Sequence, residues 1–568
     1  MTARTAPTVR TARTPRIPMP QRTFGEEGEV DFVIVGSGAS GGVLAAELSR
    51  AGFDVVVLEQ GPWRTARDFD HDEVGHWILG SLTGSPEDDP QTFRADPSEE
   101  ARVASGPPPL IYARGVGGSS VHFTANYWRL RPVDFRERSL WGPISGTGFA
   151  DWPLTYDELE PYYTRAEWEV GVSGVAAPGD PRRSRPYPMP PLPVKSSGVL
   201  FERGARAMGW NPQPAPMAIL SEAYDGRAPC MHCGYCMGYG CEVDAKSSTL
   251  ASMIPKAVAT NRCEIRPDST VIRVETSAAG RATGVVYLDA DGVEHRQRGK
   301  AVVLAANGAE TPRLLFMSES SAFPHGLANG SGLVGKYLMF NGQTASHGVF
   351  EHPLNEYRSV QVTRIMMDFY DADPARGFYG GGGMDGRMFN GPLFFALGGL
   401  PPDMPRWGEA YRRALPDYFV RTMEVAGHTT SLAVETNSVS LDPVARDRWG
   451  RPAIRTTYHD HPDDLAMMQF FVERGEEILQ AAGARKVWSS PVGPQTLGAH
   501  LLGTCRMGDD PETSVVDRFH RSHEVPNLFI CDGSSLVTSG RGQPTLTIQA
   551  LAFRAAEHMA RFARAGEI

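Results

Sequence analysis

The feature that most constrains the fold lies near the start of the chain. An apolar, β-prone run over residues 30–35 leads directly into Gly36-Ser37-Gly38-Ala39-Ser40-Gly41, which fits the pattern G-x-G-x-x-G. A helix is expected over residues 39–50 and a second buried strand over 54–58. A strand, a helix and a second strand in this order predict a parallel sheet covered by helices, which places the chain in the α/β class.

The same segment predicts a dinucleotide site. Gly36, Gly38 and Gly41 would let the backbone approach a pyrophosphate at the positive end of the helix. The second strand ends on Glu59, 18 residues after Gly41, where a carboxylate can accept hydrogen bonds from ribose hydroxyls. A carboxylate at this position argues against a 2′-phosphate. It does not decide between FAD and NAD.

Composition limits the other classes of protein. The chain has 568 residues, and at roughly 150 residues per domain this length allows three or four units. Its net charge of −10 argues against a nucleic-acid binder, which needs a basic surface. No apolar run approaches the ~18 residues of a membrane-spanning helix. The first 22 residues contain five arginines, four prolines and no acidic residue. We therefore expect a disordered tail over 1–28, with a targeting role as the alternative.

Five further motifs follow in a characteristic order, and with them the chain resembles the glucose–methanol–choline (GMC) flavoprotein oxidoreductases from residue 30 to 565. The resemblance is weakest over 64–105 and 341–490, where such enzymes differ by substrate. The motifs that carry it lie at Gly115–Ser120, Gly308–Leu315, His500–Gly508, Cys531–Ser534 and Gly540–Ile548.

The resemblance implies an α/β fold with a discontinuous, Rossmann-like FAD-binding domain. Residues 29–340 would form its first part, including a cysteine-rich segment at 225–245, and residues 491–568 its C-terminal part. Residues 341–490 would form an inserted substrate-binding domain built on an antiparallel sheet above the flavin. The reaction implied is oxidation of a CH–OH group to a carbonyl by hydride transfer to the flavin.

The resemblance also assigns flavin-binding residues. His122 stands where some members of the family attach the flavin covalently. A packed histidine beside a non-covalent flavin is the alternative. The other residues that the resemblance places at the cofactor are Gly117, Gly118, Thr124, Val271 and Asp532.

His500 aligns with the catalytic histidine of the family, and a neutral imidazole is suited to accept the hydroxyl proton of an alcohol. The second catalytic position of the family is His or Asn, whereas this chain has Gln543. An amide can orient a hydroxyl group by hydrogen bonds, but it cannot act as a base. We therefore expect His500 to remove the proton alone.

Four of the seven cysteines follow C-x2-C-x2-C-x4-C, namely Cys230, Cys233, Cys236 and Cys241. Closely spaced thiolates of this kind hold iron–sulfur clusters, whereas structural zinc more often joins two separated ligand pairs. Three interpretations stay open: an iron–sulfur cluster, structural cysteines that are reduced or disulfide-paired, and a zinc site.

The sequence favours a dehydrogenase that passes electrons to an acceptor other than oxygen, because a cluster beside the flavin would offer an electron exit. An oxidase that forms hydrogen peroxide is the first alternative, and a flavin-containing lyase the second. The predicted partners are a small alcohol or sugar substrate and an electron acceptor or small partner subunit. Without an export signal we expect a cytoplasmic protein, unless a partner carries it out.

Overall fold

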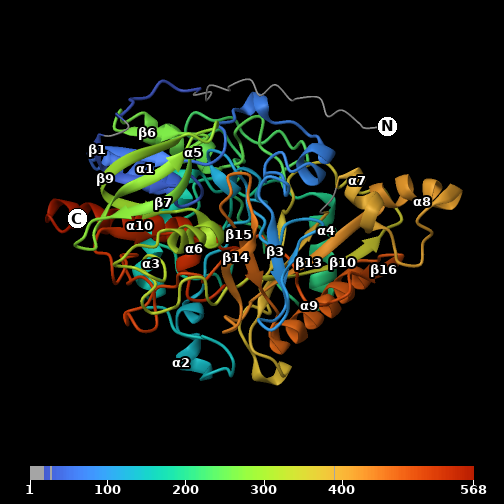
Figure 1. Ribbon diagram of the computed structural model, residues 1–568. Helices are drawn as coiled ribbons and strands as arrows, with labels where there is room; N and C mark the ends of the chain where they lie inside the picture. Colours follow the sequence, from blue (N-terminus) through green and yellow to red (C-terminus); the bar gives the residue numbers. More distant parts are fainter. Residues whose placement is uncertain (1–17, 26–27, 389–390) are drawn as a thin grey trace, which may run out of the picture.

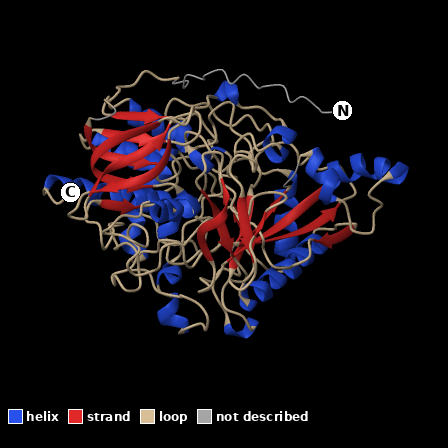
Figure 2. Ribbon diagram, in the orientation of Figure 1, coloured by secondary structure: helices blue, strands red, loops and turns tan. Residues whose placement is uncertain are grey.

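The computed structural model describes residues 18–25, 28–388 and 391–568. Three sheets lie side by side across the molecule (Figure 1, Figure 2). The first is at the left of these views, the third at the centre and the second at the right. The predicted tail over 1–28 falls partly outside the described residues. Within the described part, Gln21 donates to the carbonyl of Ile265 (2.8 Å), and the amide of Phe24 donates to Glu264 (2.6 Å). These residues are therefore held against the first sheet, which the prediction of disorder did not anticipate.

The first sheet contains the predicted strand–helix–strand unit. β1 (Glu29–Val35) pairs in parallel with β2 (Val55–Leu58), and α1 (Gly41–Arg50) connects them. The sheet runs in the order β6-β2-β1-β9-β8-β7, and β17 pairs with β9. The remaining strands are β6 (Cys263–Arg266), β7 (Thr270–Thr276), β8 (Ala282–Leu288), β9 (Glu294–Leu304) and β17 (Leu528–Ile530).

Strands from distant parts of the chain thus complete one sheet. β17 lies in the C-terminal region and pairs in parallel with β9, which agrees with a discontinuous α/β domain. α1 packs against α5 (Thr249–Val258) and α10 (Thr545–Arg564), and α10 also packs against α3 (Tyr156–Val170). α6 (Asn307–Met317) follows β9 and packs against β7.

The second sheet is antiparallel, as predicted for the segment 341–490. Its order is β16-β10-β13-β12-β11-β5, and α9 (Pro462–Ala481) and α4 (Ser196–Ala207) pack on it. Small residues allow α9 to lie close, since a Cβ added to Gly427 would be 2.9 Å from Cβ of Phe471. Its strands are β5 (Pro212–Pro214), β10 (Gly342–Val349), β11 (Arg364–Met366), β12 (Gly382–Arg387), β13 (Thr422–Thr429) and β16 (Lys486–Ser489).

A third sheet was not predicted. β14 (Ser438–Arg446) and β15 (Pro452–Thr457) form a hairpin, and β15 pairs in parallel with β3 (Gln91–Arg94), which in turn pairs with β4 (Arg102–Val103). The sequence indicated only loops and short helices over 64–105. β3 has no partner near it in the sequence except the two-residue β4, so its pairing depends on a strand about 360 residues away and leaves no local signal.

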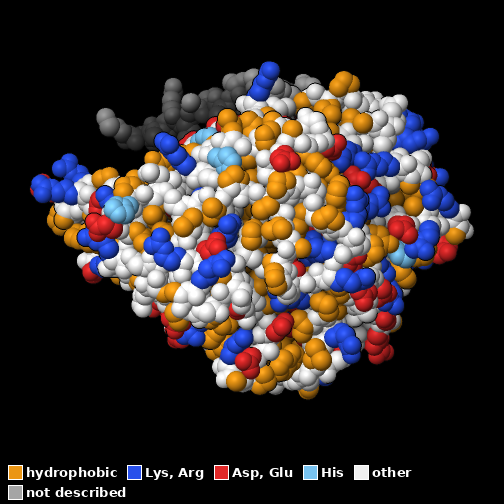
Figure 3. All heavy atoms as spheres, turned by 180° about the vertical axis from the view of Figure 1, so that it is seen from behind, with side chains coloured by type: hydrophobic (Ala, Val, Ile, Leu, Met, Phe, Trp, Pro, Cys, Tyr) orange, Lys and Arg blue, Asp and Glu red, His pale blue; other side chains and the backbone are white. Residues whose placement is uncertain are grey.

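Short helices connect these layers. No helix in the described part of the chain is long and apolar enough to cross a membrane. Acidic and basic side chains are interspersed over the face seen in Figure 3. The short or peripheral helices are η1 (Ala66–Asp68), η2 (Val74–Ile78), η3 (Gly118–Val121), η4 (Pro132–Phe135), α2 (Glu137–Trp141), η5 (Pro374–Arg376), α7 (Pro392–Phe394), η6 (Phe395–Gly399), α8 (Gly408–Arg421) and η7 (Gly533–Ser535).

Candidate active site

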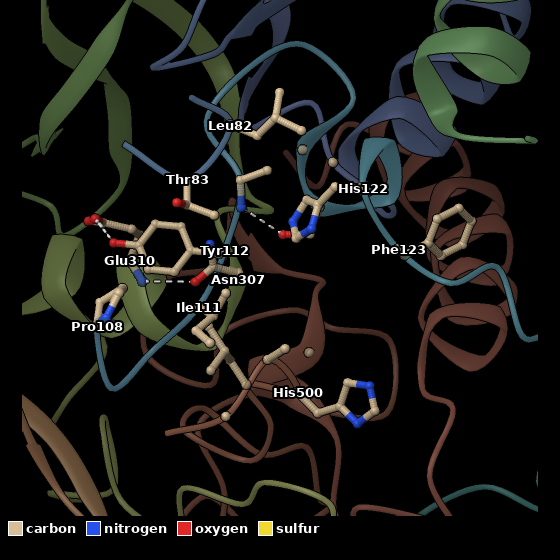
Figure 4. Close-up of a pocket in the computed structure, with 18 of the residues that line it drawn as sticks. Leu82, Thr83, Pro108, Ile111, Tyr112, His122, Phe123, Asn307, Glu310 and His500 are labelled. Atoms are coloured by element: carbon tan, nitrogen blue, oxygen red, sulfur yellow. Dashed lines mark hydrogen bonds between the residues drawn. The ribbon is translucent and has the colours of Figure 1, made fainter. Parts of the chain in front are cut away.

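One cavity of about 1400 Å³ collects most of the predicted site residues. Its size exceeds the several hundred Å³ typical of a pocket for one small ligand, which suits a dinucleotide together with a substrate. Figure 4 shows His122 and His500 on different segments of its wall. The predicted residues that line it are Gly36, Gly38, Glu59, Gly118, His122, Thr124, Val271, His500, Asp532 and Gln543.

Gly41 and Gly117 shape the wall without lining the cavity. A Cβ on Gly41 would lie 1.9 Å from the carbonyl oxygen of Gly36, so the first turn of α1 tolerates only glycine there. A Cβ on Gly118 would lie 2.7 Å from Cα of Gly38. Two glycine segments from separate parts of the chain therefore meet backbone to backbone. They leave the kind of open cradle that a pyrophosphate needs at a helix N-terminus.

Glu59 ties these two segments together. Its carboxylate accepts from the amide and hydroxyl of Ser37 (3.1 and 2.8 Å) and from the amides of Gly61 (3.1 Å) and Gly115 (3.2 Å). Ser37 in turn accepts from the amide of Gly117 (3.0 Å). Burial raises the pKa of Glu59. The side chain also lines the cavity, while its predicted contact with a ribose stays a prediction.

Asp532 fixes another part of the cavity wall. It accepts from the amide of Ser534 (2.8 Å), the amide of Asn307 (3.0 Å) and the hydroxyl of Thr311 (2.6 Å). These bonds fix the start of α6 against η7. Asp532 is buried and lines the cavity. The glycine cradle, Asp532 and the size of the cavity fit an FAD.

His122 follows η3 on the cavity wall. Burial lowers the pKa of His122 to about 4, helped by the nearby Lys246 and His76, so its imidazole is neutral at pH 7. Its Nε2 is shielded from solvent and has no hydrogen-bond partner among the described residues. The backbone carbonyl of His122 accepts from the amide of Gly238 (2.7 Å), which fastens this wall to the cysteine-rich segment.

His500 is oriented by Asn341, a residue that the sequence analysis missed. Nδ1 of His500 lies 2.9 Å from Oδ1 of Asn341. The amide nitrogen of Asn341 faces three backbone carbonyls, those of Thr429 (3.1 Å), Ser539 (3.3 Å) and Gly540 (3.3 Å). Because this nitrogen can only donate, Oδ1 must accept the hydrogen of Nδ1. The neutral His500 ring therefore keeps its lone pair on Nε2.

The environment of His500 keeps it unprotonated. Burial lowers its pKa to about 4, and the nearby His428 acts in the same direction. A neutral imidazole with a free lone pair, on the wall of a cavity, is equipped to accept a proton.

Gln543 lies in the loop that precedes α10, and its amide nitrogen is 3.2 Å from Nδ1 of His428. The opposite side of the His428 ring faces an ion pair of the second sheet. Its Nε2 lies 2.9 Å from a carboxylate oxygen of Asp385, and Asp385 also binds Arg387. His428 and Arg387 line the cavity as well. His428, Asp385 and Arg387 were not predicted as site residues, because they lie in the segment where the motifs of the family are absent.

The loop that carries Gln543 is anchored by a fully buried arginine. Arg541 binds Asp134 (3.0 Å) and Glu137, and its Nε donates to the carbonyl of Tyr370 (3.0 Å). Burial raises the pKa of Asp134 to about 6, although Arg541 opposes this. The position of the loop that carries Gln543 therefore depends on the guanidinium of Arg541.

The structure does not support the metal prediction at Cys230, Cys233, Cys236 and Cys241. All seven cysteines lie in the described part of the chain and are free thiols. In that part, no three His, Cys, Asp or Glu side chains converge as a metal-binding group. Burial raises the pKa of Cys230 to about 11 and that of Cys236 to about 12, which favours the protonated thiols. This agrees with the interpretation of reduced structural cysteines.

A buried lysine that follows the cysteine segment bonds to its backbone. The ammonium group of Lys246 is buried and donates to the carbonyls of Phe123 (3.1 Å), Cys236 (2.5 Å) and Tyr239 (2.7 Å). The segment thus packs against the cavity wall through backbone carbonyls and a cation. The spacing of the cysteines alone did not reveal this lysine.

Comparison with known proteins places this site in a family. Sequence models described as GMC oxidoreductase match residues 30–339 and 433–552. The chain is 34% identical to a 2-methyl-1,2-propanediol dehydrogenase of Mycolicibacterium austroafricanum, over 94% of this chain and 95% of the relative. It is 32% identical to a paromamine 6'-oxidase of Streptomyces fradiae, over 93% and 91%.

Solved structures give the same fold. A formate oxidase of Aspergillus oryzae superposes with a TM-score of 0.64 at 16% identity, over 95% of this chain and 100% of that one. The resemblance inferred from the motifs is confirmed by the family matches. The chain belongs to the GMC oxidoreductase family of FAD-dependent enzymes.

Proposed function

We propose that this protein oxidises a CH–OH group of a small polyol or sugar to a carbonyl, with His500 as the base. The observation that carries the proposal is the hydrogen bond from Nδ1 of His500 to Asn341, which leaves the lone pair of Nε2 available in the cavity. The hydroxyl proton of the substrate moves to Nε2. Gln543 orients the same hydroxyl through its amide.

Gly36, Gly38, Glu59, Gly118, Val271 and Asp532 would hold an FAD in the cradle. When bound, the flavin supplies the acceptor for the hydride that leaves the alcohol carbon. Thr124 lies on the same wall. His122 would hold the flavin covalently through a ring nitrogen, since its imidazole is neutral and lines the cavity. That bond would replace a C–H bond of the flavin, with the proton lost to solvent and the electron pair removed by the same acceptor that serves turnover. Attachment predicts that flavin absorbance stays with the acid-denatured wild-type protein and is released from His122→Ala.

The polar groups of the cavity support this substrate class. Asn126 and Gln343 line it in addition to the catalytic pair, so a substrate with more than one hydroxyl would find partners there. The relative named for 2-methyl-1,2-propanediol supports a polyol. Charged carboxylates are less suited, because the cationic Arg387 is already neutralised by Asp385.

We further propose that the electrons pass to an acceptor other than oxygen, which the relative named as a dehydrogenase supports. The relative named as an oxidase favours a second candidate, an oxidase that forms hydrogen peroxide. Steady-state turnover of 2-methyl-1,2-propanediol and a panel of sugars separates the two. A dehydrogenase reduces a quinone or dye acceptor much faster than it forms peroxide, whereas peroxide at a comparable rate would overturn this assignment.

A further inference from the structure

We propose that His428, held by Asp385, is a positioning residue that sets the amide of Gln543 so that one of its N–H groups faces the substrate oxygen. The proposal rests on the CH–OH oxidation proposed above and goes beyond it. It assigns the role of the second catalytic position to two residues together: Gln543 in the loop before α10 and His428 on the second sheet.

His428 sits in a rigid place. β12 and β13 are antiparallel, and Gly383 is the direct partner of His428. Because Gly383 has no side chain, Trp128 fills the space opposite, and its ring meets the His428 ring edge-on at 5.4 Å. On the other side, a Cβ added to Gly542 would lie 2.6 Å from Cβ of His428. The imidazole is thus enclosed between Trp128 and the loop that carries Gln543.

Burial, together with the guanidinium of Arg387, keeps His428 neutral. Side chains of Asp385, Arg387 and Glu424 share its face of the sheet, since directly paired and alternate residues point to the same side. Nη2 of Arg387 lies 2.6 Å from Nε2 of His428. Burial and Arg387 lower the pKa of His428, while Asp385 acts against them. Glu424 adds one more buried carboxyl, whose pKa burial raises to about 7, and His500 is the remaining titratable group nearby.

Three groups face the two ring nitrogens, and the amide nitrogen of Gln543, which can only donate, decides the tautomer. Nδ1 accepts from it, so Nε2 carries the hydrogen and the nearby guanidinium of Arg387 donates to Asp385 and not to the ring. A hydrogen on Nε2 is donated to the carboxylate of Asp385 at 2.9 Å. Nδ1 then accepts one hydrogen from the amide nitrogen of Gln543 at 3.2 Å. An amide nitrogen carries two hydrogens, so the second stays available on the cavity side, where Gln543 is part of the wall. There it can stabilise the negative charge that develops on the substrate oxygen as the proton leaves.

This arrangement explains how an amide serves at the second position. Alone, the long Gln543 side chain could rotate and present either its oxygen or its nitrogen. With Nδ1 of His428 as a fixed acceptor, the nitrogen is held on the histidine side and the oxygen is turned away. The donor is then preorganised, and donors of this kind contribute about 10²–10³ in rate.

Two measurements test the proposal on the full-length holoenzyme. The first is the ¹⁵N spectrum of the histidine rings, in which the signals of His428 are those absent from His428→Phe. We expect a neutral ring at pH 7 with its hydrogen on Nε2, and a shift of Nδ1 in Gln543→Leu. A protonated ring, a hydrogen on Nδ1, or no response to Gln543→Leu would each overturn the proposal.

The second measurement is the rate of anaerobic flavin reduction at a saturating alcohol. Gln543→Leu should lose about 10²-fold, and His428→Phe about 10-fold or more with little change in KM. Residues that act through one another are not additive, so the double variant should be no slower than Gln543→Leu within about 2-fold. His428→Gln, which again offers an acceptor, should recover part of the rate.

His347→Phe is the matched control. His347 is a half-buried histidine of the same sheet, stacked on Trp488 and outside the cavity. It should retain the wild-type reduction rate. Additive losses in the double variant, or equal losses in His347→Phe and His428→Phe, would contradict the positioning role alone. If no alcohol reduces the flavin of the wild-type enzyme, the proposed function itself fails.

Discussion

Nδ1 of His500 is bonded to Oδ1 of Asn341 at 2.9 Å, and this contact determines which nitrogen of the His500 imidazole carries the lone pair. The two residues come from different parts of the chain, one from the C-terminal motif and one from the residue that precedes β10. The bond therefore joins the C-terminal part of the chain to the segment that begins the second sheet.

Replacing Asn341 by Asp should change the pH dependence of the enzyme. A carboxylate beside Nδ1 favours the protonated imidazole and raises the pKa of His500, by about one unit or more. A plot of kcat/KM against pH should then show a rising arm closer to neutral pH than in the wild type. Gln343→Glu is the control, because Gln343 lines the same cavity without contacting His500. Equal shifts in both variants would contradict the specific contact.

The wild-type enzyme itself should show little pH dependence near neutrality. Burial lowers the pKa of His500 to about 4, so the base is already unprotonated well below pH 7. Activity would fall only as the pH decreases through that value, because protonation then removes the lone pair. We expect kcat/KM to be nearly constant between about pH 6 and 8. An apparent pKa near the usual ~6.5 of histidine would show that His500 is more exposed to water than it is here.

His500→Gln should keep the flavin and lose the chemistry. General bases of this kind contribute about 10²–10⁴ in rate, so kcat should fall by that factor while the flavin spectrum stays unchanged. The measurement is stopped-flow reduction of the bound flavin. A variant that reduces its flavin at the wild-type rate would exclude His500 as the base.

Arg541 should be essential for stability. Its side chain is fully buried between Asp134 and Glu137, so Arg541→Met leaves two buried carboxylates without a cation and should cost about 3–5 kcal/mol. Without the guanidinium the pKa of Asp134 rises further, so the folded variant binds more protons than the unfolded one, and its deficit should shrink as the pH falls. Thermal unfolding at two pH values measures this.

The control for this variant is Arg413→Met. Arg413 pairs with Glu409 on the exposed surface of α8, with side chains 79% and 65% exposed. Exposed pairs contribute about 0–1 kcal/mol. A loss in Arg413→Met as large as in Arg541→Met would mean that burial of the charge does not set the cost.

The four clustered cysteines should bind neither iron nor zinc in stoichiometric amounts. Burial raises the pKa of Cys230, Cys233 and Cys236, which favours their protonated thiols, and no three His, Cys, Asp or Glu side chains in the described part of the chain converge as a metal-binding group. Elemental analysis of the purified protein, with the visible spectrum before and after dithionite, checks this. Stoichiometric iron with a broad absorption that dithionite bleaches would restore the interpretation as an iron–sulfur cluster.

Local patterns were sufficient for the first sheet. The buried runs at 30–35 and 54–58 and the glycines between them each carry their own signal, and β1, α1 and β2 follow them closely. His500 and Asp532 were found because motifs of the family surround them. These predictions depend on neighbours in the sequence, which a single chain displays directly.

Contacts between distant segments were not predictable in this way. His428 occupies Gly427-His428-Thr429, which matches no motif, and its role depends on Gln543 more than 100 residues later. Lys246 matches no motif, although its ammonium group bonds to the carbonyls of Cys236 and Tyr239 in the cysteine segment. The pairing of β3 with β15 joins segments far apart in the sequence, so no local pattern predicted it. The cysteine spacing predicted that the thiols are close in the sequence, but not that the backbone of their segment bonds to Lys246.

The most direct test of the proposed oxidation is to mix the purified, FAD-loaded protein anaerobically with the alcohols named above and to record its visible absorption spectrum. The account predicts that a polyol or sugar bleaches the flavin bands of the wild-type protein and leaves those of His500→Gln nearly unchanged. A protein that shows no flavin bands after reconstitution with FAD, or that no alcohol bleaches, would contradict it.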